Sequence, residues 1–213
     1  MGADLTATET ARKRYDRIAP LYDMMEGFAE VLNHGKWRRL QWSKVEGTDI
    51  LEVGVGTGKN FPWYPAGARV SAIDFSKRML ERARAKSDKD KVKVRLRQMD
   101  VQNLEFGDDS FDTVVASFVF CSVPDPVLGL HEIRRVCRPG GKVILLEHVL
   151  SSNRVLARLM NLANPLAVRM MGANINRRTA DNVARSGLTI QKVTDLGAGI
   201  FKLIEARKTA TPS

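Results

Sequence analysis

The sequence predicts an α/β protein built on a mostly parallel sheet with helices on both faces. From Asp49 onward, short apolar runs alternate with helical segments, which is the pattern of a parallel sheet covered on two sides. A glycine-rich turn at residues 54–58 follows the first apolar run directly. The length of 213 residues suits one domain with a full core and is short for two.

Residues 1–46 are predicted to form an N-terminal helical cap, and residues 47–213 to form the main domain. Apolar residues between positions 9 and 46 recur at three- and four-residue steps, as on one side of an amphipathic helix. Pro20 is expected to begin a helix or to break one, because its ring does not fit inside a helix.

The main domain is predicted to contain seven strands. Runs rich in aliphatic and β-branched residues, bounded by turn residues, mark them. The predicted strands are residues 49–53, 69–73, 92–98, 111–118, 142–146, 188–193 and 200–206. Helices are predicted at residues 77–86 and 126–137, the second closed by the stop signal Arg138-Pro139-Gly140-Gly141. An apolar and basic helical insertion at residues 151–186 separates the fifth strand from the last two.

The glycine turn has three glycines at alternate positions, Gly54, Gly56 and Gly58. Glycine lets the backbone bend tightly and approach a ligand without a Cβ in the way. A dinucleotide-binding turn has the spacing G-x-G-x-x-G, and its third glycine falls at position 59, where this chain has Lys59. The spacing therefore argues against a dinucleotide.

Asp74 ends the second predicted strand, twenty residues after Gly54. A carboxylate at the carboxyl end of a strand accepts hydrogen bonds from the hydroxyl groups of a ribose. Helix capping is the alternative role for Asp74, but Ser76 already suits the start of the following helix. We therefore predict that Asp74 binds a ribose beside the glycine turn.

These motifs resemble those of class I S-adenosylmethionine (SAM)-dependent methyltransferases. The resemblance rests on residues 52–58, 72–76, 99–104 and 132–141, which occur in that family's order. It implies a Rossmann-like fold with a seven-stranded, mostly parallel sheet, and SAM as the cofactor. The residues that it assigns to the cofactor are Glu52, Gly54, Gly56, Gly58, Asp74, Phe75, Ser76, Asp100, Val101 and Ser117. Asp100 and the Val101 backbone are assigned to adenine, whose amine donates to a carboxylate.

The N-terminal segment resembles one methyltransferase group more narrowly. Residues 14–23 are similar to the start of the quinone C-methyltransferases, in which this segment folds over the cofactor. The resemblance implies that Tyr22 binds the methionyl carboxylate of SAM and that Tyr15 faces the substrate. An amphipathic helix with buried tyrosines is the alternative.

Two later segments point to other acceptors. Residues 145–149 and 174–179 resemble the soluble bacterial phosphatidylethanolamine N-methyltransferases, which convert that lipid stepwise to phosphatidylcholine. Residues 121–124 and 147–149 also resemble membrane-associated thiol methyltransferases. The acceptor is therefore predicted to be a phospholipid amine, with a quinone carbon or a thiol as alternatives.

The charge balance favours the lipid. The chain carries 34 Lys and Arg against 24 Asp and Glu, a net charge of +10, which attracts an anionic membrane or nucleic acid. It has no recognisable nucleic-acid-binding module, no secretory signal and no apolar run long enough to span a bilayer. The apolar-basic regions 9–46 and 151–178 suit a headgroup interface. We therefore predict a cytoplasmic protein, without a nucleic-acid partner, that docks on the anionic inner face of the cytoplasmic membrane; its oligomeric state stays open.

Methyl transfer to an amine needs a free lone pair, and an amine like that of Lys has a pKa of about 10.4. The residues predicted to hold or deprotonate the amine are Glu147 and His148, at the expected end of the fifth strand, together with Tyr15. The residues predicted to bind the substrate are Phe118, whose ring suits a methylated ammonium group, and Arg177 or Arg178 for a lipid phosphate. A small-molecule methyltransferase with the basic helices as a lid, and a non-catalytic SAM-binding module, are the alternatives.

The two cysteines point to neither a metal site nor a disulfide. Cys121 and Cys137 lack metal-ligand spacing and a pairing pattern, so no metal is predicted and both are expected to be reduced thiols. Cys121 ends an apolar run and is expected to pack in the core.

Overall fold

The computed structural model describes residues 9, 34–171 and 173–209 of the chain. Most of the predicted N-terminal cap, including Tyr15 and Tyr22, lies outside these residues. The described part of the cap contains α2 (Gly35–Trp42), which falls within the range predicted to be helical. The side chains of Gln41 and Trp42 in this helix are both buried against the sheet.

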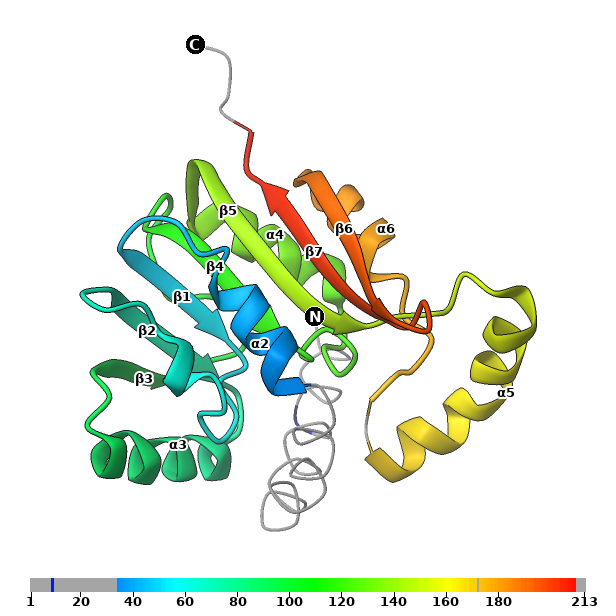
Figure 1. Ribbon diagram of the computed structural model, residues 1–213, viewed down its shortest axis with the longest axis horizontal. Helices are drawn as coiled ribbons and strands as arrows, with labels where there is room; N and C mark the ends of the chain where they lie inside the picture. Colours follow the sequence, from blue (N-terminus) through cyan, green and yellow to red (C-terminus); the bar gives the residue numbers. More distant parts are fainter. Residues whose placement is uncertain (1–8, 10–33, 172, 210–213) are drawn as a thin grey trace.

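The main domain contains a seven-stranded sheet with the order β3-β2-β1-β4-β5-β7-β6 (Figure 1). The strands are β1 (Asp49–Val53), β2 (Arg69–Asp74), β3 (Val94–Gln98), β4 (Phe111–Ser117), β5 (Cys137–His148), β6 (Thr189–Gly197) and β7 (Phe201–Arg207). The first five strands are parallel, and β7 pairs antiparallel with both β5 and β6. Because β2 and β4 flank β1 on opposite sides, the chain reverses direction across the sheet at the β1/β4 boundary. The predicted Rossmann-like fold is confirmed.

Helices cover both faces of this sheet. The other helical elements are η2 (Phe61–Trp63), α3 (Lys77–Asp90), α4 (Pro126–Val136), α5 (Arg154–Met171) and α6 (Thr179–Arg185). In β4, Val114 and Ala116 join an apolar cluster that includes α4 and α6 residues, whereas Val115 joins a cluster with Trp42 of α2. Successive residues of a strand point to opposite faces, so a strand buried on both sides has an unbroken apolar run.

Side-chain caps begin both helices that the sequence predicted. Ser76 Oγ accepts the Met79 N–H at 3.2 Å, and Asp125 Oδ1 accepts the N–H groups of Val127 and Leu128 at 3.0 Å. Such caps satisfy backbone donors that the first turn of a helix leaves without partners. The capping role predicted for Ser76 is confirmed, and α3 continues four residues past its predicted end.

The start of β5 was predicted wrongly. The stop signal after residue 136 does end α4, but residues 137–141 join β5 instead of forming a turn. Gly140 has φ +75°, and its N–H donates to the Lys208 carbonyl at 2.8 Å while Lys208 N–H donates back to Gly141. Pairing with the chain that follows β7 therefore extends the strand, and this partner is distant in sequence.

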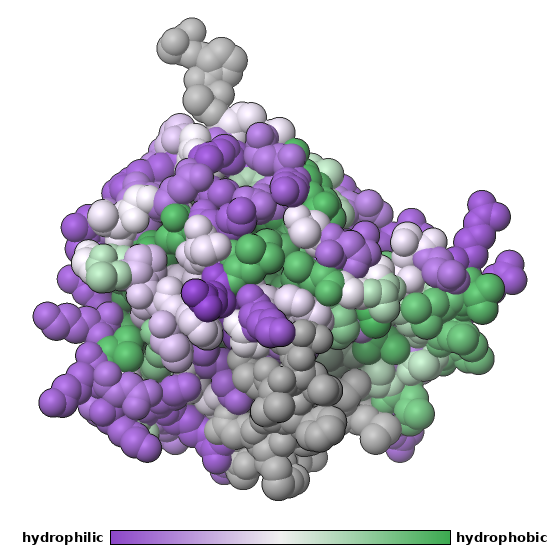
Figure 2. Space-filling view, viewed as in Figure 1, coloured by the Kyte–Doolittle hydropathy of each residue, from purple (hydrophilic) through white to green (hydrophobic). Residues whose placement is uncertain are grey.

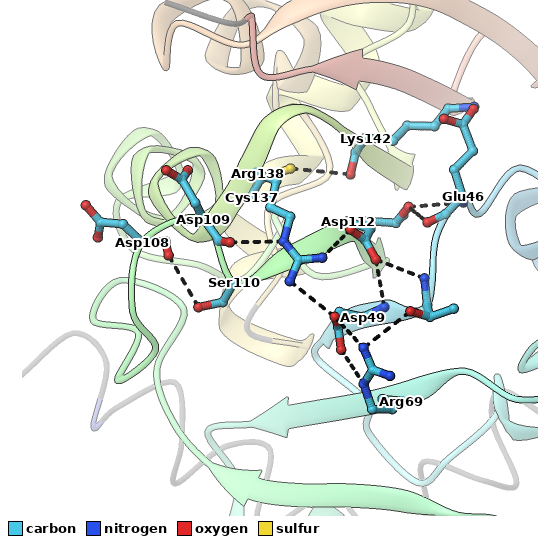
Figure 3. A network of polar contacts seen from close by, with 12 residues as sticks. Glu46, Asp49, Arg69, Asp108, Asp109, Ser110, Asp112, Cys137, Arg138 and Lys142 are labelled. Atoms are coloured by element: carbon cyan, nitrogen blue, oxygen red, sulfur yellow. Dashed lines mark hydrogen bonds and ion pairs between the residues drawn. The ribbon is translucent and has the colours of Figure 1, made fainter.

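A network of charged side chains joins the amino-terminal ends of the strands, opposite the carboxyl ends (Figure 3). Asp49 at the start of β1 pairs with Arg69 at 2.7 Å and with Arg138 at 3.2 Å, and Arg138 also pairs with Asp112. The hydrogen bond from Arg69 holds the pKa of the Asp49 carboxyl below its usual range. We interpret this network as structural, because it links strands β1, β2, β4 and β5 at the end of the sheet away from the glycine turn.

Helix α5 projects beyond the sheet (Figure 1), and hydrophobic surface gathers over it in Figure 2. Four of its large aliphatic residues are exposed: Val155 by 68%, Leu159 by 57%, Leu162 by 80% and Leu166 by 61%. Their four- and three-residue spacing places them in one stripe along the helix. The helix contains three arginines and no acidic residue. Across the described ranges, no helix has the length and apolar character needed to cross a membrane.

Candidate active site

A cavity lies at the carboxyl ends of β1, β2 and β4. This is the β1/β4 boundary at which the strand order reverses, and ligands of open α/β sheets bind at such a point. The structure brings together at this cavity most of the residues predicted for the cofactor. The predicted residues that line it are Gly54, Gly56, Asp74, Phe75, Asp100, Val101, Ser117 and Phe118.

The glycine turn needs glycine for two separate reasons. Gly54 and Gly58 have φ values of +70° and +81°, and a Cβ at either would lie 2.4 Å from a side-chain atom of Val119 or Phe61. Gly56 has φ +55°, and a Cβ there would meet no atom within 4 Å. Because Gly56 lines the cavity, its bare backbone leaves room for a ligand to approach closely.

Asp74 connects β2 to this turn. Its Oδ2 accepts the Gly56 N–H and its Oδ1 accepts the Ser76 N–H, both at 2.9 Å. The carboxylate is 6% exposed and lines the cavity, and a carboxylate oxygen can accept more than one hydrogen bond. This geometry fits the predicted contact with ribose hydroxyl groups.

Asp100 and Val101 lie after β3 on the same cavity. The Asp100 carboxylate accepts the backbone N–H of Gln102 at 2.9 Å and both of its oxygens accept the Gln102 side-chain amide. The Asp100 side chain is thereby held in one orientation beside Val101, which is buried. The arrangement fits an acceptor for the amine of adenine, so the residues present fit a SAM molecule.

Among the predicted cofactor residues, Gly58 does not line the cavity, and neither do Glu52 and Ser76. Glu52 is 1% exposed and lies behind the glycine turn, where Oε1 accepts the Asn60 amide at 2.6 Å and Oε2 accepts the Tyr64 hydroxyl. Burial raises the pKa of Glu52. We propose that these two residues support the turn, Glu52 through Asn60 and Ser76 as the α3 cap.

A buried polar chain links α2 to this site. Asn60 also donates to Ser117 Oγ at 3.1 Å, and Ser117 donates to the Gln41 side-chain oxygen at 2.7 Å. The Gln41 amide donates in turn to the carbonyls of Ala116 in β4 and Ile144 in β5, at 2.8 and 3.0 Å. Helix α2 is therefore anchored on the strand ends that carry the cavity.

The loop between β4 and α4, residues 118–124, forms one side of the cavity and is called the cavity wall below. Phe118 begins it with φ +58°, a left-handed conformation that a bulky residue rarely adopts. Glu147 Oε1 accepts the N–H groups of Val119 and Phe120 at 3.0 and 3.1 Å. Consecutive N–H groups after a left-handed residue form an acceptor-binding concavity.

Glu147 was predicted to contact the methyl acceptor, and the structure places it differently. Its side chain is 0% exposed, it does not line the cavity, and its described bonds go to the cavity wall. The prediction missed this because the sequence does not reveal the left-handed Phe118 that turns two amides toward the carboxylate. We propose that Glu147 holds Phe118 in place and does not act as the base.

Replacing Glu147 by glutamine is expected to change how stability depends on pH. Burial raises the pKa of Glu147 from 4.5 to about 8. Between these values the folded protein keeps a proton that the unfolded chain has lost, so the wild type loses stability as the pH rises. As the pH rises through this range, the free energy of unfolding of the wild type should fall by up to about 1.4 kcal/mol per pH unit more than that of Glu147→Gln. Denaturant unfolding of both proteins at pH 5, 6, 7 and 8 measures this difference. If the two free energies of unfolding depend on pH in the same way, the prediction is wrong.

His148 lies next to the cavity wall within an aromatic cluster. Its ring contacts Phe201 edge-on with centroids 5.2 Å apart, and Phe201 contacts Phe118 at 6.3 Å. His34 stacks on Phe118 at 4.9 Å, and the Arg38 guanidinium lies 5.3 Å from the same ring. Burial lowers the pKa of His148, so its imidazole is neutral at pH 7. His148 does not line the cavity, and its role in proton transfer stays a prediction.

The two arginines predicted for a lipid phosphate have different surroundings. Arg177 is half-buried and donates from Nη2 to the Val123 carbonyl at 2.9 Å, within the cavity wall. Arg178 is exposed, and its guanidinium lies 3.9 Å from the Asp181 carboxylate. Arg178 is therefore better placed to meet a phosphate from solution.

Sequence reasoning missed part of the cavity. Val119, Ser122, Val123 and Pro124 line it from the wall, as do Met79 and Met99 from α3 and the end of β3. The short run after β4 resembled methyltransferase motifs, but its residue types carry no cofactor chemistry. The chain position directly after the fourth strand was the available signal.

Comparison with known proteins identifies the family. The methyltransferase domain family matches residues 51–145. A phosphatidylethanolamine N-methyltransferase from Cereibacter sphaeroides is 40% identical over 142 residues, covering 66% of this chain and 68% of the relative. A demethylmenaquinone methyltransferase from Clavibacter sepedonicus is 35% identical over 137 residues, covering 62% of this chain and 56% of that relative. The solved structure of geranyl diphosphate methyltransferase in complex with SAM superposes with a TM-score of 0.67 at 15% identity, over 82% of this chain and 85% of that one.

The sheet order is that of a Rossmann-like methyltransferase, a class whose cofactor is SAM, and the glycine turn and the two carboxylates fit a site for it. The chain belongs to the class I SAM-dependent methyltransferases. Within that class it is 40% identical to the relative named phosphatidylethanolamine N-methyltransferase.

Proposed function

We propose that the protein transfers methyl groups from SAM to the amine of phosphatidylethanolamine, stepwise toward phosphatidylcholine, at an anionic membrane surface. The observation that carries this is the exposed apolar stripe of α5, bordered by Arg154, Arg158 and Arg169 without any acidic residue. A helix of this kind lies in a headgroup interface with its arginines near anionic lipid. The 40% identical relative of that name supports the same lipid.

Bound SAM supplies a methyl group activated by a positively charged sulfur. The chain's own contribution is to orient the two reactants and to exclude water, since in-line displacement depends on alignment. We propose that Asp74 and Asp100 hold the nucleoside, while the cavity wall, with Phe118 at its start, faces the acceptor. The half-buried Phe118 ring suits a product that stays positively charged after each transfer.

The amine must lose a proton before it can react. With a pKa of about 10.4, its deprotonation at pH 7 costs about 4–5 kcal/mol. We propose that the amine releases its proton to water before the site closes. His148, whose imidazole is neutral, is the alternative acceptor; it lies beyond Phe201 from Phe118 and would act through water. Tyr15 and Tyr22, outside the described residues, are proposed for the substrate side and for the methionyl carboxylate.

A vesicle assay tests the proposed substrate. Incubation of the protein with methyl-labelled SAM and vesicles of phosphatidylethanolamine and phosphatidylglycerol is expected to yield mono-, di- and trimethylated lipid, resolved by mass. Vesicles of phosphatidylcholine and phosphatidylglycerol, which offer no free amine, are the control. Label found in a quinone or an alkyl thiol, and not in lipid, would refute the proposal.

A small-molecule acceptor is the second candidate, because the relative at 35% identity is named demethylmenaquinone methyltransferase. In that case α5 serves as an ordinary lid. Activity toward a soluble quinone should then be the same with and without anionic vesicles.

A further inference from the structure

The cavity wall is held from outside by a segment that lies far along the chain. Asn174 donates its backbone N–H to the Cys121 carbonyl at 2.8 Å, and its side-chain amide donates to the same oxygen at 3.2 Å. Arg177 adds its bond to the Val123 carbonyl at 2.9 Å. Since Val123 lines the cavity and Cys121 lies between two lining residues, these bonds bear directly on the shape of the wall.

The same segment is joined to α5. Asn164, within α5, accepts the Ile175 N–H at 2.9 Å and donates its amide to Asn174 Oδ1 at 3.3 Å. Leu162 and Leu166 lie two residues to either side of Asn164, and two residues turn about 200° around a helix. The helix therefore exposes its leucines on one side and bonds to Asn174 from another.

We infer that Asn174 is a positioning residue that couples the docking of lipid on α5 to the binding of SAM in the cavity. The inference rests on the membrane docking in the proposed function. A membrane that orders or shifts α5 acts on Asn164, then on Asn174, and through Cys121 on the cavity wall. Coupling between two ligands is reciprocal, so lipid raises the affinity for SAM by the factor by which SAM raises the affinity for lipid.

The test measures this factor directly. The dissociation constant of S-adenosylhomocysteine is measured by calorimetry, with and without vesicles of phosphatidylethanolamine and phosphatidylglycerol. We expect the wild type to bind at least about fivefold more tightly when vesicles are present, the lower end of typical coupling. The ratio should fall toward one in Asn174→Ala, which loses the side-chain bonds to Cys121 and Asn164 and keeps the backbone bond to Cys121.

A matched control separates coupling from general loosening of α5. Asn161 of α5 accepts the Asn176 side-chain amide at 2.9 Å, a bond to the same segment that does not reach the cavity wall. Asn161→Ala should keep the wild-type ratio. Asn164→Ala, which leaves Asn174 intact, should lose it, so the test does not depend on a single variant.

Kinetics provide a readout that mere instability does not produce. On vesicles, Asn174→Ala should raise KM for SAM about fivefold with a smaller change in kcat, whereas partial unfolding lowers kcat. A ratio near one in the wild type, or equal ratios in wild type and Asn174→Ala, overturns the inference. Vesicle sedimentation and methylation of short-chain phosphatidylethanolamine are measured separately, so failure of docking or of the proposed substrate is distinguished from failure of coupling.

Discussion

Replacing Asp74 by alanine is expected to weaken SAM binding by about 3–6 kcal/mol, because two charge-assisted hydrogen bonds of about 1.5–3 kcal/mol each are lost. The same change removes the acceptor for the Gly56 and Ser76 N–H groups, which loosens the glycine turn where it meets the ligand. Calorimetry with S-adenosylhomocysteine measures the loss.

Two further variants make this result specific. Asp74→Asn keeps one oxygen in nearly the same place and should lose less affinity than alanine. Asp88→Ala removes an exposed carboxylate from the same helix–strand region and should leave the affinity unchanged. Unchanged affinity in Asp74→Ala would mean that the ribose does not lie on Asp74.

Replacing Leu159 and Leu162 together by aspartate is expected to abolish docking on membranes. Burying each leucine contributes about 1.5–3 kcal/mol, so the double change should lower the vesicle partition coefficient at least roughly a hundredfold. The side chains are 57% and 80% exposed, so the fold has little reason to change. Sedimentation with vesicles of phosphatidylethanolamine and phosphatidylglycerol measures the coefficient, and methylation of vesicle lipid should fall with it.

The control makes the same kind of change, an exposed aliphatic residue to aspartate, at two positions outside α5. Leu128 on α4 and Val193 on β6 are each 41% exposed, and Leu128→Asp with Val193→Asp should leave the partition coefficient within about twofold of the wild type. If the α5 variant still binds vesicles as the wild type does, lipid docks elsewhere or the acceptor is not a membrane lipid.

Local rules in the sequence predicted most of the fold. The seven strands were found because each is a short apolar run between turn residues, and Ser76 was identified as a cap from its position before an amphipathic run. The start of β5 was missed, since residues 137–141 have turn composition and become a strand by pairing with Phe111 of β4 and with Lys208. A partner that distant leaves no mark in the local pattern.

The same distinction applies to the candidate site. Gly54, Gly56, Asp74 and Asp100 were predictable, because each lies at or just after the carboxyl end of a strand, where a nucleoside binds, and that position is visible in the chain. Glu147 has equally suggestive chemistry, yet its carboxylate binds the amides of the cavity wall. The type of a residue and its position at the end of a strand do not show whether its side chain lines the cavity or is buried behind it.

The sequence by itself therefore determined the strand–helix alternation, the glycine turn and the carboxylates at the end of β2 and just after β3, because these depend on residues close together in the chain. Only the tertiary structure decided that Arg177 and Asn174 hold the cavity wall, that Gln41 anchors α2, and that α5 presents its leucines outward. These contacts join residues separated by more than fifty positions, or depend on which side of a helix is left uncovered. Both are set by how the elements pack and not by the order of the residues within them.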